Sequence, residues 1–422
     1  MEIISASHPA AEGLALPGSA TLPHGQPAAT GGMRIAVVAN TTWYVYNFRR
    51  NLMLHLKEMG HELFAVGPED RYADLFRQEG IPHISVPFHG AGKNPVRELE
   101  TLLRLRRIFS EHRIDVVLSY TPKGNIYSAF ALAGRDGKLV VNVSGLGRAF
   151  SREGLLARTV QRLYQQAFRR AEWVFFQNDE DRSTFIDKRI VSHARSSRLP
   201  GSGVDLRRFS GVDQATNGSG NAASASPAFL FVARLLWDKG IGEYVEAARL
   251  VKQRYPEARF RVLGSIDRGG ASAVPEETLR SWVEQGLIDY LGACDDVRPH
   301  LAAADCVVLP SFYREGVPRS LLEAAAMRRP VITTDAVGCR DTVDDQLTGL
   351  LCKPRDSADL AEKICRFIAM PPAERVLMGS RAREKMERDF DERIVIDAYS
   401  ALLHAPQAEA GQHAGAAPAA SA

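Results

Sequence analysis

The sequence predicts an α/β protein built from two doubly wound, parallel-sheet domains that face each other. Short apolar runs alternate with helical patterns from residue 33 onward, which is typical of parallel strands joined by helices. A stretch rich in Gly, Ser, Ala and Asn interrupts this alternation within residues 204–227, and a second series follows. Facing domains of this kind place ligands in the crevice at the carboxyl ends of their strands.

The first domain is expected over residues 33–203. Residues 33–39 predict a buried strand, and the next apolar positions follow a helical period up to Gly60, where the helix should end. These positions are Phe48, Leu52, Leu56 and Met59. Further strands are predicted at 63–66, 114–119, 139–143 and 174–177.

The second domain is expected over residues 228–388, after a linker at 204–227. Its predicted strands are 229–233, 259–263, 288–291, 306–309 and 331–333. A helical pattern at 394–403 follows. Residues 1–32 and 406–422 are rich in Ala, Gly and Pro without periodicity, which predicts a disordered extension and a disordered tail.

Composition excludes some classes of function. The 422 residues include 53 Lys and Arg against 50 Asp and Glu, and a net charge of +3 is too small to indicate nucleic-acid binding. The 5 cysteines show no metal or redox spacing and fit a reducing cytoplasm. Without a signal-peptide pattern or a membrane-spanning run, we expect a cytoplasmic protein whose membrane contact is peripheral.

The segment Glu315-Gly-Val-Pro-Arg-Ser-Leu-Leu-Glu323 carries two carboxylates around a predicted helix start. Pro318 suits the first helical position, so Glu315 should lie in the preceding loop and Glu323 in the second turn. A helix amino terminus attracts phosphate, and carboxylates accept hydrogen bonds from sugar hydroxyls, so the segment could hold a nucleotide-sugar. The alternative is that both glutamates are ordinary solvated charges.

A resemblance favours the first interpretation. Together with Pro310-Ser311 and Gly338-Cys339-Arg340, the segment resembles the donor site of family-4 retaining glycosyltransferases of the GT-B type, over roughly residues 33–400. The resemblance implies that Glu315 faces the transferred sugar, that Glu323 binds the ribose, and that residues 389–405 cross back to the first domain. It extends donor binding to Gly316, Val317, Arg319, Ser320 and Leu321, with Leu291 and Gly292 as neighbours of a uracil base.

Two cations follow the strand at 229–233. Arg234 and Lys239 share one loop at the predicted crevice, where Arg can bind phosphate oxygens with a bidentate fork and Lys adds a mobile charge. An isolated pair of this kind is usually solvated. In the resembled family, an Arg and a Lys at this spacing neutralise the departing diphosphate, so we assign both residues a catalytic role.

The first domain offers candidates for acceptor binding. Asn47-Phe48-Arg49 resembles a bacterial branch that extends polyprenyl-diphosphate-linked glycans, so Arg49 could meet an acceptor phosphate, although an arginine on a helix surface is commoner. Lys123 follows the strand at 114–119, where turn chemistry is the alternative, and Gly145 could let a substrate approach the backbone. Residues 40–43 lack a dinucleotide fingerprint, which disfavours redox chemistry.

Residues 148–170 contain six arginines and one glutamate among helically spaced apolar residues. This pattern fits a basic amphipathic helix lying on anionic lipid, or a surface helix that packs on its own sheet. The apolar positions are Leu155, Leu156, Val160, Leu163, Tyr164, Ala167 and Phe168.

The resemblance implies a retaining transferase that moves a sugar from a UDP-sugar to a polyprenyl-diphosphate-linked glycan at the cytoplasmic face of the inner membrane. No metal-ligand cluster is visible, so we expect no cofactor and metal-independent donor binding. Alternatives are a transferase with a soluble acceptor, a GT-B sugar-nucleotide epimerase and a non-enzymatic nucleotide-sugar-binding scaffold. The missing export signal disfavours a periplasmic sugar receptor.

Overall fold

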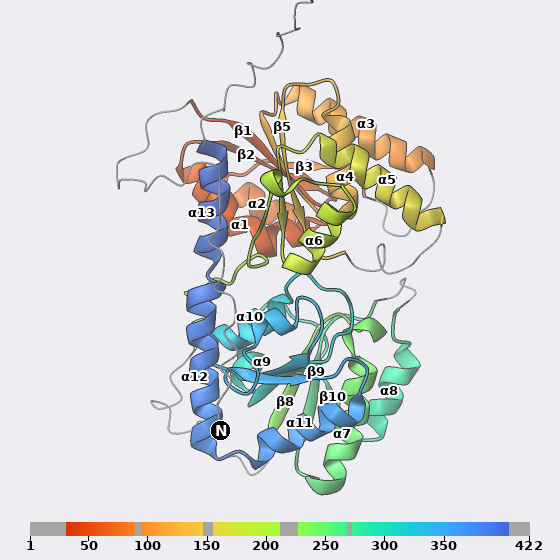
Figure 1. Ribbon diagram of the computed structural model, residues 1–422, viewed down its shortest axis with the longest axis vertical. Coiled ribbons are helices and arrows are strands. Elements are labelled where there is room, and N and C mark those ends of the chain that lie inside the picture. The colour runs from red at the N-terminus through yellow and green to blue at the C-terminus, as the bar shows by residue number, and fades with distance from the viewer. Residues whose placement is uncertain (1–30, 89–94, 147–154, 212–226, 268–271, 405–422) are drawn as a thin grey trace, which may run out of the picture.

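The computed structural model of the chain describes residues 31–88, 95–146, 155–211, 227–267 and 272–404, with the side chains of 155–160 left out. The predicted disorder at 1–32 and 406–422 therefore lies almost wholly outside the described residues, as do most of the linker and residues 148–154. Two α/β domains lie one above the other (Figure 1). This confirms the predicted fold class.

The first sheet has seven strands in the order β3-β2-β1-β4-β5-β6-β7, and every pairing is parallel. Its strands are β1 (Arg34–Val38), β2 (Glu62–Gly67), β3 (His83–Ser85), β4 (Val116–Tyr120), β5 (Lys138–Val143), β6 (Trp173–Phe176) and β7 (Ser196–Arg198). Its helices are α1 (Thr42–Glu58), α2 (Arg71–Gln78), α3 (Pro95–Glu111), α4 (Pro122–Ala131), α5 (Leu155–Arg169) and α6 (Asp179–Asp187).

The second sheet has six parallel strands in the order β10-β9-β8-β11-β12-β13. They are β8 (Ala228–Val232), β9 (Arg259–Leu263), β10 (Asp289–Tyr290), β11 (Cys306–Leu309), β12 (Val331–Thr334) and β13 (Gly349–Cys352). The helices are α7 (Ile241–Arg254), α8 (Glu276–Glu284), α9 (Arg298–Ala302), α10 (Arg319–Ala326), α11 (Ser357–Ala369), α12 (Pro372–Asp389) and α13 (Glu392–His404). The strand order reverses between β1 and β4 and between β8 and β11, where this fold binds ligands.

Three short strands were not predicted: β3, β7 and β13. β3 and β7 are edge strands of three residues with polar positions, so the sequence gives no apolar run to detect. The start of α10 also differs by one residue. Pro318 has extended backbone angles and is the N-cap, so the helix begins at Arg319.

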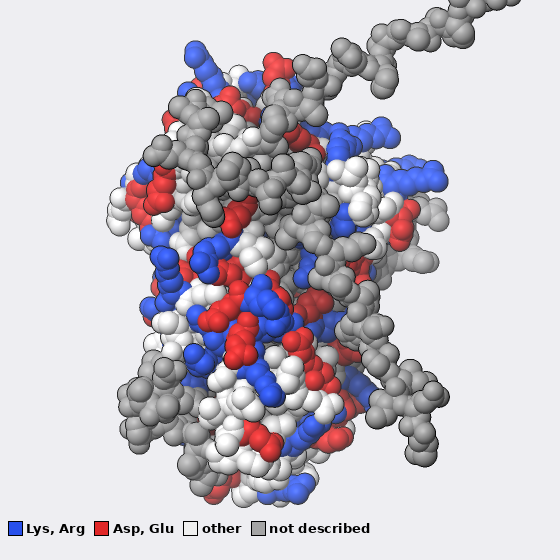
Figure 2. Space-filling model, turned by 60° about the vertical axis from the view of Figure 1, so that its left-hand side comes forward, with Lys and Arg blue, Asp and Glu red and all other residues white. Residues whose placement is uncertain are grey.

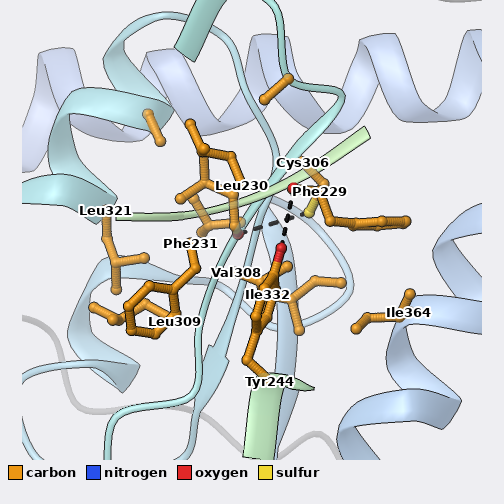
Figure 3. Packing of buried hydrophobic residues seen from close by; sticks show 14 of the residues in the cluster. Phe229, Leu230, Phe231, Tyr244, Cys306, Val308, Leu309, Leu321, Ile332 and Ile364 are labelled. Carbon is orange, nitrogen blue, oxygen red and sulfur yellow. Dashed lines mark hydrogen bonds between the residues drawn. The ribbon is translucent and has the colours of Figure 1, made fainter. Parts of the chain in front are cut away.

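The core of the second domain fixes the strands that carry the predicted donor loops. Phe229 and Phe231 of β8 pack with Val308 of β11 and Tyr244 of α7 (Figure 3). The hydroxyl of Tyr244 is fully buried and donates to the carbonyl of Phe229 at 3.0 Å. Such a satisfied polar group in a dense core holds the helix against the sheet in one position.

The end of the chain returns to the first domain. α12 runs along the second domain and α13 continues beside the first (Figure 1). Tyr399 of α13 is buried against Phe175 of β6, with ring centroids 4.8 Å apart. The two segments that pass between the domains pair with each other, because the N–H of Val204 donates to the carbonyl of Phe390 at 2.8 Å.

Candidate active site

The loop before α10 lies where backbones of both domains meet. A Cβ on Gly145, which has φ +101°, would come within 2.6 Å of the nitrogen of Gly316. A Cβ on Gly338, with φ +79°, would come within 2.0 Å of the carbonyl oxygen of Gly316. Only glycine allows this close approach, so Gly145 provides an interdomain contact beside Glu315.

Glu315 forms an ion pair with Lys239, between Oε1 and Nζ. Both side chains are largely buried, with 11% and 17% exposed. The hydroxyl of Ser311, at the end of β11, donates to the same carboxylate oxygen at 2.9 Å. The two predicted catalytic residues therefore meet although 76 positions separate them, and a desolvated pair of this kind has a fixed geometry.

Tyr313 covers this ion pair. The Nζ atom of Lys239 lies 5.3 Å from the centroid of its ring, within the range of a cation–π contact. Burial raises the pKa of Tyr313, and the nearby carboxylate of Glu315 raises it further. The phenol therefore stays neutral and can donate a hydrogen bond at neutral pH.

Arg234 lies more openly than Lys239. Its side chain is 63% exposed, and its Nη1 atom is 3.5 Å from Oδ2 of Asp267. A solvated guanidinium in such a loose pair can exchange partners at little cost. The structure thus gives the two predicted phosphate-binding cations different settings: one fixed and one available to move.

Glu323 pairs with Arg319 one turn earlier on α10, with 3.0 Å between Oε1 and Nε. Arg319 also donates to Oγ of Ser202 at 3.0 Å and lies over the ring of Phe48, 5.3 Å from its centroid. Burial raises the pKa of Glu323, and Arg319 opposes this rise. Glu323, which is predicted to bind the ribose, thus pairs with an arginine that contacts the first domain.

The other residues predicted to bind the donor lie in two places, around the start of α10 and directly after β10. The N–H of Val317 points into the domain junction, Ser320 is half-buried, and Leu321 is fully buried in the core of the second domain. Leu321 therefore does not present its side chain to a ligand. Leu291 and Gly292 follow β10, where they bond to Val262 and Gly264 through the backbone, and Leu291 is 37% exposed.

Arg49 is buried, with 1% exposed, and does not lie on the surface of α1. Its guanidinium carbon lies 4.4 Å from the ring centroid of Tyr120, and Nη2 donates to the hydroxyl of Tyr44 at 3.4 Å. Among the described residues it has no ion-pair partner. Burial acts to lower its pKa, but the surrounding tyrosines outweigh burial and the pKa is raised, so the cation is retained.

The remaining predicted acceptor residues lie apart from one another. Asn47 donates from Nδ2 to the carbonyl of Trp43 at 2.9 Å on α1. Lys123 begins α4 and pairs with Glu98 of α3 at 2.6 Å. Asn47 and Arg49 line a small interdomain cavity of about 60 Å³ together with Arg319. A larger, shallow depression lies at the amino ends of β1, β4 and β5, by Asp115 and Gly137.

Sequence reasoning missed the polar residues at the end of β6. Gln177, Asn178 and Asp181 contact the loop that carries Glu315. A polar run directly after a buried strand was the available signal, because strand ends of this fold face the crevice. The predicted strand at 174–177 includes Gln177, whereas β6 ends at Phe176.

Part of the basic stretch packs inside the first domain. Tyr164, Ala167 and Phe168 of α5 belong to its core, as the packed-helix alternative expects, while Leu163 is 40% exposed. Leu155, Leu156 and Val160 lie outside the described side chains. No described helix is long and apolar enough to span a bilayer, and the described residues hold no group of three or more His, Cys, Asp and Glu placed for a metal.

Two family models match the chain. The model described as Glycosyl transferase 4-like domain matches residues 47–200, and the model described as Glycosyl transferases group 1 matches residues 226–370. The first match runs from within α1 to the end of β7, and the second runs from β8 to the end of α11, so together they span most of the chain.

Similar proteins include bacterial glycan transferases. The chain is 27% identical over 382 residues to the N,N'-diacetylbacillosaminyl-diphospho-undecaprenol alpha-1,3-N-acetylgalactosaminyltransferase of Campylobacter jejuni, covering 88% of this chain and 98% of the relative. It is 27% identical over 181 residues to the amylovoran biosynthesis glycosyltransferase AmsK of Erwinia amylovora, covering 41% and 44%. Among solved structures, HepE of Anabaena in complex with UDP and glucose superposes with a TM-score of 0.72 at 17% identity, covering 89% of this chain and 100% of HepE.

Proposed function

This chain is a family-4 glycosyltransferase with the GT-B fold, and from that premise we propose that it moves a sugar from a UDP-sugar to a glycan carried on a polyprenyl diphosphate, with retention at the anomeric carbon. The product would enter a bacterial surface polysaccharide or glycan. The observation that carries the proposal is the buried pair of Glu315 and Lys239 at the switch point of the second sheet.

In the proposed reaction, the bond between the anomeric carbon and the diphosphate oxygen breaks, and a bond to an acceptor hydroxyl oxygen forms on the same face. The acceptor proton passes to the departing diphosphate. Lys239 and Arg234 stabilise the charge on that diphosphate, aided by the amino terminus of α10, while Glu315 orients the sugar. We propose that Glu323 binds the ribose, that Leu291 and Gly292 adjoin the uracil, and that no metal is needed.

The acceptor would bind at the carboxyl ends of the first sheet. The lipid-linked acceptor is proposed from the Campylobacter relative, whose name specifies a diphospho-undecaprenol substrate and whose length the chain nearly covers. Asn47 lines the interdomain cavity, and Lys123 lies at the start of α4, beyond the end of β4. Arg49 could reach a phosphate only after the side chains that bury it move.

A surface beside this edge fits an anionic membrane. α3 exposes Val96, Leu99 and Leu103 at helical spacing, and α3, α4 and α5 lie next to one another (Figure 1). The same helices carry exposed arginines, of which Arg104 and Arg107 pair with Glu100 and Glu111 of α3. These arginines are Arg97, Arg104, Arg106 and Arg107 on α3 and Arg162 and Arg169 on α5. We propose that this basic, apolar surface rests on the cytoplasmic leaflet and brings the acceptor within reach.

The test is UDP release by the purified protein with a panel of UDP-sugars, with and without undecaprenyl-diphosphate-linked mono- and disaccharides in detergent. Release that requires the lipid-linked acceptor, and falls at least about 100-fold in Glu315→Gln but not in the exposed control Glu374→Gln, supports the proposal. Product NMR reads the anomeric configuration. Turnover only with a soluble sugar, or epimerisation of the donor, would overturn the acceptor or the reaction.

A further inference from the structure

Three side chains of the first domain contact the loop that carries Glu315. Oε1 of Gln177 accepts from the N–H of Val317 at 3.1 Å, and Nδ2 of Asn178 donates to the carbonyl of Glu315 at 3.2 Å. Oδ1 of Asp181 accepts from Nε of Arg314 at 2.6 Å. Arg314, Glu315 and Val317 of the proposed catalytic loop are thus held by the first domain.

Gln177 also begins a chain of hydrogen bonds that runs back into the first domain. Its Nε2 atom donates to Oδ1 of Asn142 at 3.2 Å, which accepts a second bond from Oγ of Ser144 at 3.2 Å. Because Ser144 uses its proton there, the hydroxyl of Tyr44 must donate to Oγ of Ser144, 3.1 Å away. Tyr44 itself accepts from Arg49.

Every bond in this chain has a definite direction, from Arg49 to Oδ1 of Asn142 on one side and from Gln177 to the same oxygen on the other. Asn142 cannot turn its amide without losing both bonds, and its Nδ2 atom lies 3.4 Å from the hydroxyl of Tyr399. Asn142 is fully buried and Gln177 nearly so. Buried networks that are satisfied in this way adopt one arrangement, because each broken bond leaves an unpaired polar group.

The two ends of the chain lie at different substrates of the proposed reaction. Tyr44 belongs to α1, three residues before Asn47, at the edge where the acceptor would bind. Val317 lies two residues after Glu315, beside the proposed site of the donor sugar. A shift of Tyr44 would therefore change the hydrogen bond that fixes the backbone next to Glu315.

We propose that Tyr44, Ser144, Asn142 and Gln177 form a relay of positioning residues that places the Glu315 loop according to the state of the acceptor side. The inference rests on the proposed function and adds residues that act through Val317 without touching the reacting atoms. With the relay broken, the donor still binds the second domain, but Glu315 is held less well for transfer, so a larger share of donor turnover ends in hydrolysis.

A double-mutant cycle tests the relay. Tyr44→Phe and Gln177→Met are made singly and together, with Tyr255→Phe and Gln166→Met as controls from positions without a side-chain hydrogen bond to the loop. Each single variant should lower kcat for transfer about tenfold, with the donor KM within about twofold of the native value, and should raise the ratio of hydrolysis to transfer. The kcat of the double variant should be no lower than that of the less active single variant, because both changes break the same chain.

Losses that multiply in the double variant would mean two independent structural effects and would overturn the relay. Losses in KM alone, or equal losses in the controls, would do the same. If Gln177→Met does not fold, Gln177→Glu takes its place, since it keeps an acceptor for Val317 but removes the donor to Asn142. If the native protein transfers no sugar, the proposed function is refuted, and the relay is refuted as well because it rests on that function.

Discussion

The two domains present their crevice edges in different ways. The second domain concentrates its candidate residues in two short segments: Lys239 of one loop meets Glu315 of another, and Arg319 meets Glu323 within α10. The first domain assembles its edge from α1, from the ends of β5 and β6, and from α13, largely through buried polar side chains such as Asn142. A charged site confined to short segments can bind a ligand common to many relatives, whereas a dispersed edge can change one contact at a time.

Removing Lys239 should have the largest effect. Lys239→Met removes the fixed cation that we propose lies beside the diphosphate, and it leaves Glu315 without its ion-pair partner. We expect kcat for transfer to fall about 100- to 1000-fold, while Arg234→Met, at an exposed side chain, loses less. Steady-state kinetics against the exposed control Lys353→Met measures this. A larger loss in Arg234→Met would reverse the assignment of the two cations.

The next effect concerns the junction itself, where acidic and basic side chains gather between the domains (Figure 2). Asp181 is fully buried, and Arg314→Met would leave its carboxylate without a counter-ion. Because Arg314 is partly exposed, we expect a loss of about 2–3 kcal/mol in the free energy of unfolding, below the range for fully buried pairs. Urea denaturation measures it.

Asp181→Asn provides the matching control for this ion pair. Burial raises the pKa of Asp181 and Arg314 opposes the rise, so adding Asp181→Asn to Arg314→Met should recover most of the lost stability. A double variant as unstable as Arg314→Met alone would show that the buried charge is not the cause.

The outer surface of the first domain should give a smaller effect. Leu99→Ser with Leu103→Ser should weaken binding to vesicles containing anionic lipid about tenfold, because two exposed leucines would no longer enter the interface. Sedimentation with vesicles measures this, and Leu347→Ser, at an exposed leucine of the second domain, is the control. If the native protein, the double variant and Leu347→Ser bind the vesicles equally, α3 is not part of the membrane-binding surface.

The smallest effect should be a pH dependence confined to the first domain. Burial lowers the pKa of His83, and Glu69 only partly opposes this. The folded state therefore holds fewer protons than the unfolded state, and the stability from the neutral ring is present above about pH 6.5 and lost as the pH falls below it. The melting temperature of His83→Gln should fall less between pH 7 and pH 5 than that of the native protein, with His300→Gln as the control. Parallel curves would contradict this.

The sequence predicted the architecture well where apolar patterns are local. Five strands of each sheet and the end of α1 shortly before Gly60 followed from period and punctuation, but the short edge strands depend on neighbours far along the chain. The buried setting of Arg49 was visible in the pattern of α1, because Val45, Arg49, Leu52 and Leu56 fall on one helical face. Lys239 and Glu315 were each predicted to act on a different part of the donor. The ion pair between them became apparent only in the tertiary structure.

The relay could not have been predicted. In the sequence, Gln177 and Asn142 resemble ordinary residues at strand ends. Their proposed role depends on a series of hydrogen bonds that reaches from the first domain to Val317 of the second domain. Sequence patterns record burial and turns, whereas such a direction depends on which protons neighbouring groups have already used.

The return of α13 to the first domain has a consequence for the order of folding during synthesis. The last strand of the first sheet ends at Arg198, but Tyr399, Leu402 and Leu403 of α13 complete its core. On the ribosome, the first domain must therefore wait with an apolar face uncovered until the entire second domain has emerged. Truncation within α13 should therefore uncover the apolar core of the first domain, although that domain is far from α13 in sequence. The second domain should stay intact.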